Sequence, residues 1–187
     1  MQNPVGRRLE LMNWPTLRRA ADRRGSTVLW PFGAIEQHGP HLPLATDALF
    51  ADRIADAVLE RLDTDLPIWR LPLQAIGFSP EHGGFPGTLS LGAEAVITLV
   101  MAVGRDLQVA GFKRLVLFNA HGGQIGLLEV AARQLRSSHP ALAVLPCFVW
   151  RGPEGIAELI PEPEPVSYTH LTLPTTCNLC RSRWSPY

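Results

Sequence analysis

Hydrophobic and polar residues alternate along the chain in blocks that predict strands and helices in turn. Four short, continuously apolar runs are typical of strands buried on both faces of a sheet. They cover residues 27–35, 66–73, 114–119 and 142–149. Four stretches with apolar residues at helical spacing precede or follow them. They cover residues 14–24, 47–62, 93–110 and 124–138. This order predicts an α/β fold, a three-layer sandwich with a mainly parallel central sheet.

Several boundaries of these elements carry local signals. Asn13 precedes Trp14-Pro15 and predicts a helix start, with the asparagine as N-cap and the proline in the first turn. Leu49, Phe50, Ile54, Val58 and Leu62 recur at helical spacing and support the helix over residues 47–62. Pro31 weakens the strand over residues 27–35, because proline has no N–H for the ladder.

A long loop rich in glycine and proline joins the second strand to the third helix. It runs from Gln74 to Gly92, which is unusually long for a compact domain and therefore a candidate for function. Within it, Glu81, His82 and Phe85 are candidates for a wall of a substrate site. The alternative is a rigid, turn-rich cover with no chemical role.

Side chains that bind metals follow the predicted strands. Glu36 and His38 come directly after the first strand, and Asp47 opens the helix that follows it. His82 lies in the long loop, and His121 comes two residues after the third strand. Because open α/β sheets bind ligands at the carboxyl edge of their strands, we expect these residues to converge there.

Their chemistry predicts a divalent metal. Mixed nitrogen and oxygen ligands suit Zn2+ or Mn2+ better than Ca2+, which takes oxygen ligands alone. Structural roles are the alternative for each residue: Asp47 as a helix N-cap, His121 as a helix cap, and His38 and His41 as turn residues.

Composition narrows the class of partner. Lys and Arg together number 17, as do Asp and Glu, so no basic excess favours nucleic acid. The longest apolar run, around residues 96–103, is far too short to span a membrane, and no secretory signal is visible. The three cysteines form no disulfide framework. We therefore expect a cytoplasmic protein with no nucleic-acid or membrane partner.

Three successive segments resemble signatures of the creatininase family. They are EQHGPHLP with Thr46-Asp47 (residues 36–47), FPGT (residues 85–88) and NAHGG (residues 119–123). The resemblance covers residues 13–150. It implies a sheet sandwiched by helices, a homo-oligomer that is usually a hexamer, and a site with two Zn2+ or Mn2+ ions per subunit, Fe2+ being a further candidate. It also implies hydrolysis of an amide-like C–N bond in a small molecule or a peptide.

The resemblance assigns a role to each ligand. Glu36 is expected to bind one metal and His38 the other, with Asp47 bridging them and His121 joining Glu36's metal. Creatininase itself has a further glutamate ligand where this chain has Gly123. Other family members take that glutamate, and a proton-shuttling histidine, from a later motif that this chain does not contain.

The composition changes after residue 150, toward Thr, Ser, Arg and Cys without periodicity. We expect a creatininase-like domain over residues 1–166, incomplete at its C-terminal end, and a read-through tail over residues 167–187. A zinc-binding tail through Cys177 and Cys180 is the alternative, although one CxxC pair alone is a weak signal. The missing motif leads us to expect a poor catalyst.

Two other functions compete with the metal-dependent amidohydrolase. One is an α/β module that binds a small molecule without hydrolysing it, or an inactive fragment of such an enzyme. The other is a nucleotide-binding protein, which is disfavoured because no strand is followed by GxGxxG or a P-loop.

Overall fold

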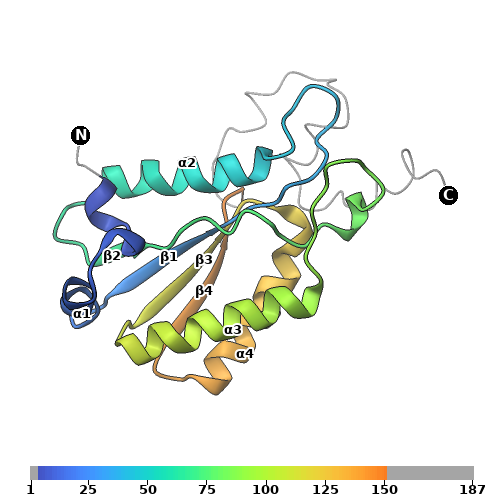
Figure 1. Ribbon diagram of the computed structural model, residues 1–187. Coiled ribbons are helices and arrows are strands. Elements are labelled where there is room, and N and C mark those ends of the chain that lie inside the picture. Colours follow the sequence, from blue (N-terminus) through green and yellow to red (C-terminus); the bar gives the residue numbers. More distant parts are fainter. Residues whose placement is uncertain (1–3, 151–187) are drawn as a thin grey trace.

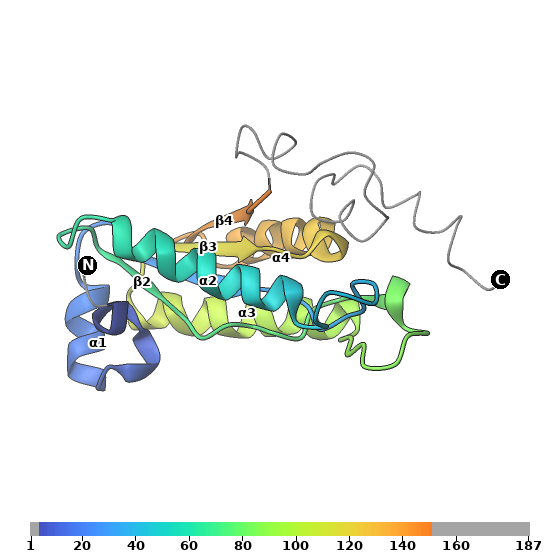
Figure 2. The same ribbon diagram turned by 90° about the horizontal axis from the view of Figure 1, so that it is seen from above.

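A computed structural model describes residues 4–150, with a four-stranded sheet between two layers of helices (Figures 1 and 2). The strands are β1 (Thr27–Phe32), β2 (Ile68–Arg70), β3 (Arg114–Asn119) and β4 (Ala143–Phe148). The main helices are α1 (Trp14–Ala21), α2 (Thr46–Arg61), α3 (Ala93–Ala110) and α4 (Ile125–Ser138). Short 3-10 helices are η1 (Pro4–Arg7), η2 (Leu9–Leu11), η3 (Pro80–His82) and η4 (Gly122–Gln124). The predicted tail, residues 167–187, and the boundary at residue 166 lie outside the described residues.

All four strands run parallel, in the order β2-β1-β3-β4, so the predicted α/β class and parallel sheet are confirmed. Strand β1 pairs with β3 along its whole length, from Thr27 opposite Arg114 to Phe32 opposite Asn119. Parallel strands end at a common edge. The segments that follow β1 and β3 therefore leave the sheet side by side.

Alternate residues of the strands face two different cores. Val28 and Trp30 of β1 and Leu115 of β3 pack in the larger core, which contains residues of α1, α3 and α4. Leu29 of β1 and Phe118 of β3 pack in the smaller core, with residues of α2. In Figure 1, α2 accordingly lies above the sheet, whereas α3 and α4 lie below it.

Helix α2 packs on the sheet through small residues. Its buried side is formed by Thr46, Asp47, Ala48, Ala51, Ala55 and Leu59. The spacing of larger apolar residues predicted this helix, yet Leu49 is 46% exposed and Val58 is 40% exposed. The close approach is most marked at Gly33, where an added Cβ would lie 2.4 Å from the Ala48 Cα atom. Small side chains thus let the start of α2 sit directly against the end of β1.

Two predicted strands are shorter in the structure. The run over residues 27–35 forms a strand only to Phe32, and the run over residues 66–73 forms one only over Ile68–Arg70. Pro31 nevertheless lies inside β1. Its carbonyl accepts from Gln74 N at 2.9 Å, on the side where β2 has already ended, so its missing N–H interrupts no strand pairing.

The remaining boundaries agree closely with the sequence pattern. Asn13 caps α1 by accepting a hydrogen bond from Thr16 N, as predicted, although the helix ends at Ala21 rather than near residue 24. Helix α3 has its predicted bounds and ends at Gly111, whose φ of +106° suits glycine.

An ion-pair network joins α2 to the edge of the sheet. The side chain of Arg70, 1% exposed, pairs with Asp52 at 2.6 Å and with Asp56. Arg8 also pairs with Asp56, at 2.6 Å. This network fixes the position of α2 along the sheet. Within residues 4–150, no helix combines the length and the hydrophobicity that crossing a membrane requires.

Candidate metal centre

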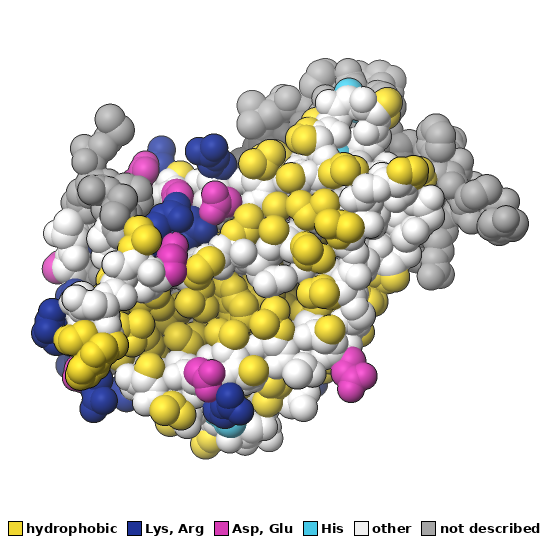
Figure 3. All heavy atoms as spheres, in the orientation of Figure 1, with side chains coloured by type: hydrophobic (Ala, Val, Ile, Leu, Met, Phe, Trp, Pro, Cys, Tyr) yellow, Lys and Arg dark blue, Asp and Glu magenta, His cyan; other side chains and the backbone are white. Residues whose placement is uncertain are grey.

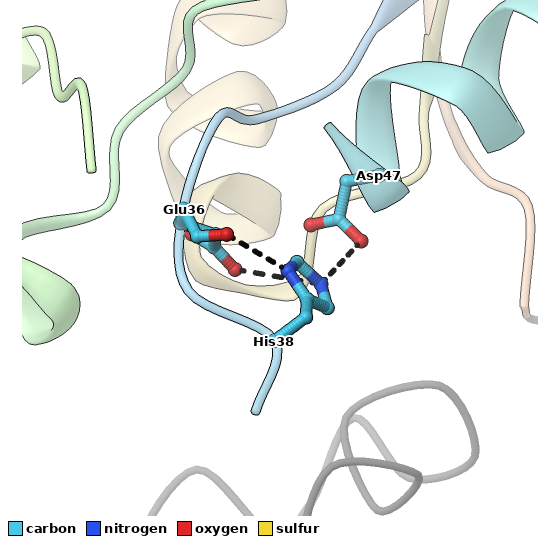
Figure 4. Close-up of side chains that lie close together, drawn as sticks. All are labelled: Glu36, His38 and Asp47. Carbon is cyan, nitrogen blue, oxygen red and sulfur yellow. Dashed lines mark hydrogen bonds and ion pairs between the residues drawn. The ribbon is translucent and has the colours of Figure 1, made fainter. Parts of the chain in front are cut away.

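The structure brings the four predicted ligands together at the carboxyl edge of the sheet. Glu36 and His38 follow β1, Asp47 lies in the first turn of α2, and His121 follows β3. All four are buried, with 2% to 5% of each residue exposed. Figure 4 shows Glu36, His38 and Asp47 directed toward one another.

Asp47 is the centre of this cluster. Its Oδ1 lies 3.2 Å from His38 Nε2, and its Oδ2 lies 2.9 Å from His121 Nδ1. The N-cap residue of α2 is Ala45, so Asp47 does not cap the helix. One carboxylate therefore faces an imidazole nitrogen on each of its two oxygens.

Glu36 completes the cluster from the other side. Its Oε1 lies 3.4 Å from His121 Nδ1 and 4.0 Å from His38 Nε2. Its Oε2 is buried and has no hydrogen-bond partner among the described residues. A buried carboxylate oxygen without a partner is costly unless a cation or a proton satisfies it.

Backbone carbonyls fix the orientation of both imidazoles. His38 Nδ1 lies 3.1 Å from the Glu36 carbonyl oxygen, and His121 Nε2 lies 2.9 Å from that of Phe78. A carbonyl oxygen only accepts, so each of these nitrogens carries a hydrogen. In the neutral rings, the lone pairs then belong to His38 Nε2 and His121 Nδ1, the atoms that face Asp47. Metal-binding histidines are held in the same way by their outer nitrogen.

This arrangement shifts the pKa values of the four side chains in the cluster. Burial alone would raise the pKa of Asp47, but hydrogen bonds from His121 and His38 lower it to about 2. Burial would lower the pKa of His121, but the hydrogen bond to Asp47 raises it to about 9. Burial raises the pKa of Glu36. For His38, the hydrogen bond to Asp47 outweighs burial and raises the pKa.

This donor set fits divalent cations. Glu36, His38 and Asp47 each offer a ligand atom, and these atoms lie within 4.8 Å of one another. Two imidazole nitrogens with two carboxylates suit Zn2+ and Mn2+. The protons on the two imidazoles satisfy Asp47 in the way that two cations would, one on each oxygen.

The long loop reaches the same cluster, but its three candidate residues differ. His82 is 5% exposed, and its Nε2 lies 3.7 Å from Glu36 Oε1. Glu81 is 37% exposed at its side chain and lies 4.0 Å from His121 Nε2. Phe85 is 37% exposed, with its ring edge-on to that of His82. Their contact with a substrate stays a prediction.

Sequence reasoning missed the buried amide that ties these segments together. Gln124, at the end of η4, is fully buried and accepts a hydrogen bond from Phe78 N. Its Nε2 donates to the Gly33 carbonyl oxygen at 3.2 Å and to Asn119 Oδ1 at 2.9 Å. It thus links the long loop, the end of β1 and the end of β3. A glutamine at a helix start carries no signal of such a role in the sequence.

A separate cavity of about 300 Å³ lies between α4 and the end of β4. Its lining includes Asn119, Leu145 and Cys147 but none of the four candidate ligands. We therefore assign it no part in the metal centre.

Comparisons with known proteins relate most of the described region to one family. The family model Creatininase, described as creatinine amidohydrolase, matches residues 10–171. The mycofactocin precursor peptide peptidase of Mycobacterium ulcerans (strain Agy99) is 45% identical over 116 residues, 59% of this chain and 46% of that protein. The creatinine amidohydrolase of Pseudomonas putida is 30% identical over 148 residues, 72% of this chain and 55% of that protein.

The fold agrees with these matches. A solved structure described as creatininase Mn has a TM-score of 0.72 and 25% identity, covering 88% of this chain and 68% of the other. The chain spans about half the length of the curated relatives it matches.

Proposed function

The chain belongs to the creatininase family, and we propose that it is a metal-dependent hydrolase of an amide-type C–N bond. The observation that carries this proposal is Asp47, whose two oxygens each face a ring nitrogen of a buried histidine, the nitrogen that has the lone pair when the ring is neutral. A carboxylate in that position suits a bridge between two cations.

We assign the ligands of each cation from the contacts. Glu36 and His121 would hold one cation together with Asp47 Oδ2, since their ligand atoms lie 3.4 Å apart. His38 and Asp47 Oδ1 would contribute to the other. When bound, such cations polarise a carbonyl group and lower the pKa of water. The protein's part is to keep the site dry and to hold its ligands in one orientation.

Two substrate classes are open to this site. Related proteins are a peptidase of a precursor peptide and a creatinine amidohydrolase, so the substrate proposed here is a peptide or a small cyclic amide. Glu81, His82 and Phe85 of the long loop border the ligand cluster from one side and are the proposed substrate-binding residues. Zn2+ or Mn2+ are the proposed cofactors, since a related structure is described as creatininase Mn. Fe2+ is a third candidate.

Metal binding tests the proposal directly. Chelated protein reloaded with Zn2+ or Mn2+ is expected to retain divalent metal after dialysis, with His38→Ala and His121→Ala each lowering the amount bound. His139→Ala is the matched control, because His139 lies at the end of α4 and away from the cluster. Equal metal content in wild type and in the double variant His38→Ala/His121→Ala would refute the assignment.

Hydrolysis separates the enzyme from a binding module without activity. The metal-loaded chain is assayed against small cyclic amides, formamides and short peptides, with Asp47→Asn as the inactive reference. Metal-dependent turnover that Asp47→Asn abolishes supports the hydrolase. Metal binding without turnover of any of them favours the two alternatives, a binding module or an inactive fragment of such an enzyme.

A further inference from the structure

A third buried histidine, His82, borders the ligand cluster, and its donor and acceptor nitrogens are placed the opposite way from those of His38 and His121. The outer nitrogens of His38 and His121 meet carbonyl oxygens, as described above. His82 Nδ1 instead lies 3.0 Å from the side-chain nitrogen of Gln37. An amide N–H only donates, so the ring must accept at this atom.

A backbone N–H fixes the orientation of the Gln37 amide. Gly39 N donates to Gln37 Oε1 at 3.0 Å. Because a backbone N–H cannot accept, the Gln37 oxygen must face Gly39 and its NH2 group must face His82. His82 Nδ1 therefore has a lone pair, and the hydrogen of the neutral ring is on Nε2.

This polarity decides what His82 can do. Glu36, Glu81 and His82 lie within 4.8 Å of one another, a spacing that could hold a cation. A ring nitrogen that carries a hydrogen cannot be a metal ligand, and Nε2 is the atom on the cluster side, 3.7 Å from Glu36 Oε1. His82 thus presents an N–H, whereas His38 and His121 present lone pairs.

Glu36 is the acceptor that this N–H faces. Its carboxylate is buried, and its Oε1 lies 3.7 Å from His82 Nε2. This Oε1 is also the oxygen that faces His121 Nδ1, and a carboxylate oxygen has two lone pairs, so it can bind a cation with one and face an N–H with the other. Metal ligands are commonly held by such hydrogen bonds, and losing one typically weakens metal binding by about 10–100-fold.

We propose that His82 is a positioning residue that orients the Glu36 carboxylate by directing its Nε2–H toward it, and that it is not itself a ligand. The orientation is set by the chain Gly39 N–H to Gln37 to His82. The proposal depends on one part of the proposed function, namely that Glu36 binds a cation. No change of protonation is involved.

The variant His82→Gln tests the role. Glutamine can accept from Gln37 through its oxygen and donate to Glu36 through its nitrogen, so it preserves the polarity of the neutral ring. We expect His82→Gln to keep the Co2+ stoichiometry and absorption spectrum of the wild type. His82→Leu should weaken Co2+ binding by about 10–100-fold. His38→Gln, which removes a lone-pair nitrogen, should lose a cation. Loss of a cation in His82→Gln as well would make His82 a ligand and overturn the proposal.

Nitrogen-15 NMR of the histidine rings tests the polarity without metal or activity. In the chelated full chain, the hydrogen of His82 is expected on Nε2, with His82→Gln identifying its signals. Gln37→Glu should move the hydrogen to Nδ1, because a carboxylate only accepts. A wild-type His82 with its hydrogen on Nδ1 would overturn the proposal. A wild type that binds no Co2+ would instead refute the proposed function. The position of the His82 hydrogen could still be measured, because the NMR experiment uses metal-free protein.

Discussion

At the scale of single residues, the ligand cluster is organised by which atoms can donate. Asp47 faces two ring nitrogens, and the carbonyls of Glu36 and Phe78 determine that these nitrogens have lone pairs when the rings are neutral. Without a metal, protons take up the same positions. A metal that binds here therefore has to displace protons, so its affinity would depend on pH.

The metal-free protein should be most stable in mildly acidic solution. Asp47 has its pKa lowered from 3.8 to about 2, so its contribution is present above pH 3.8 and is lost as the pH falls toward 2. His121 has its pKa raised from 6.5 to about 9, so its contribution is present below pH 6.5 and is lost as the pH rises through 9. The raised pKa of Glu36 also favours the lower part of this window.

Thermal unfolding of chelated protein between pH 5 and pH 9.5 measures this effect. The melting temperature is expected to fall above pH 6.5 in the wild type, and His121→Asn should flatten that part of the profile. His139→Asn serves as the control. An unchanged slope in His121→Asn would show that His121 is not the group responsible.

The sequence predicts which residues are candidate ligands, but not which of their atoms donate hydrogen bonds and which accept them. Glu36, His38, Asp47 and His121 could be placed at one edge because each follows a strand or opens the next helix. The contact of Gln37 with His82 spans 45 residues and has no local pattern. Long-range contacts between polar side chains depend on the packed fold, which periodicity does not contain.

At the scale of elements, the position of α2 decides where Asp47 lies. The helix starts against the end of β1, with no room for a side chain at Gly33. It is then held along the sheet by the pairs of Arg70 with Asp52 and Asp56. The first turn of α2 therefore has one position relative to the segment that carries Glu36 and His38.

Gly33→Ala should disturb the site through this contact. The added methyl group would lie 2.4 Å from the Ala48 Cα atom, so the start of α2 must move. Overpacking of this kind costs about 1–3 kcal/mol in the free energy of unfolding. We expect chemical denaturation to show that loss, together with weaker Zn2+ binding in calorimetry.

Gly126→Ala is the matched control, because nothing lies within 4 Å of a Cβ at that helical position. It should leave the free energy of unfolding unchanged or raise it slightly, since alanine favours helices. If Gly33→Ala and Gly126→Ala bind Zn2+ with equal affinity, the position of α2 does not affect metal binding at the site.

Element boundaries could be predicted where one signal dominates. Helix α3 and strand β3 have the bounds that the sequence predicts, and Gly111 ends α3 before β3 begins. The packing side of α2 could not be predicted from its large apolar residues, because a close approach to the sheet selects alanines. Strands β1 and β2 were overestimated because apolar residues continue into segments that leave the sheet.

At the scale of the whole molecule, the surface of residues 4–150 has apolar side chains that no described residue covers. Figure 3 shows a broad, hollowed patch of hydrophobic side chains between α2 and α3. Among individual residues, Trp14 of α1 is 81% exposed and Val109 of α3 is 79% exposed. Large exposed apolar areas are typical of protein interfaces. They agree with the homo-oligomer that the family resemblance implies, which stays a prediction.

Light scattering coupled to size exclusion tests self-association. The wild type is expected to elute above the mass of one chain, and Trp14→Glu combined with Val109→Glu should shift it toward the monomer. Leu49→Glu is the control on α2, across the sheet from α1 and α3. A monomeric wild type at the highest soluble concentration would exclude the oligomer, and equal shifts in all variants would place the interface elsewhere.

The pairing of β1 with β3 also determines at which stage of folding a metal could bind to the candidate ligands. The candidate ligands extend from Glu36 to His121, and His121 meets Asp47 across 74 residues only after these strands have paired. Such distant parallel pairing forms slowly, because the loop entropy is lost before the contacts are gained. The cation would then arrive after the rate-limiting step of folding. It would lengthen the lifetime of the folded chain without hastening its formation.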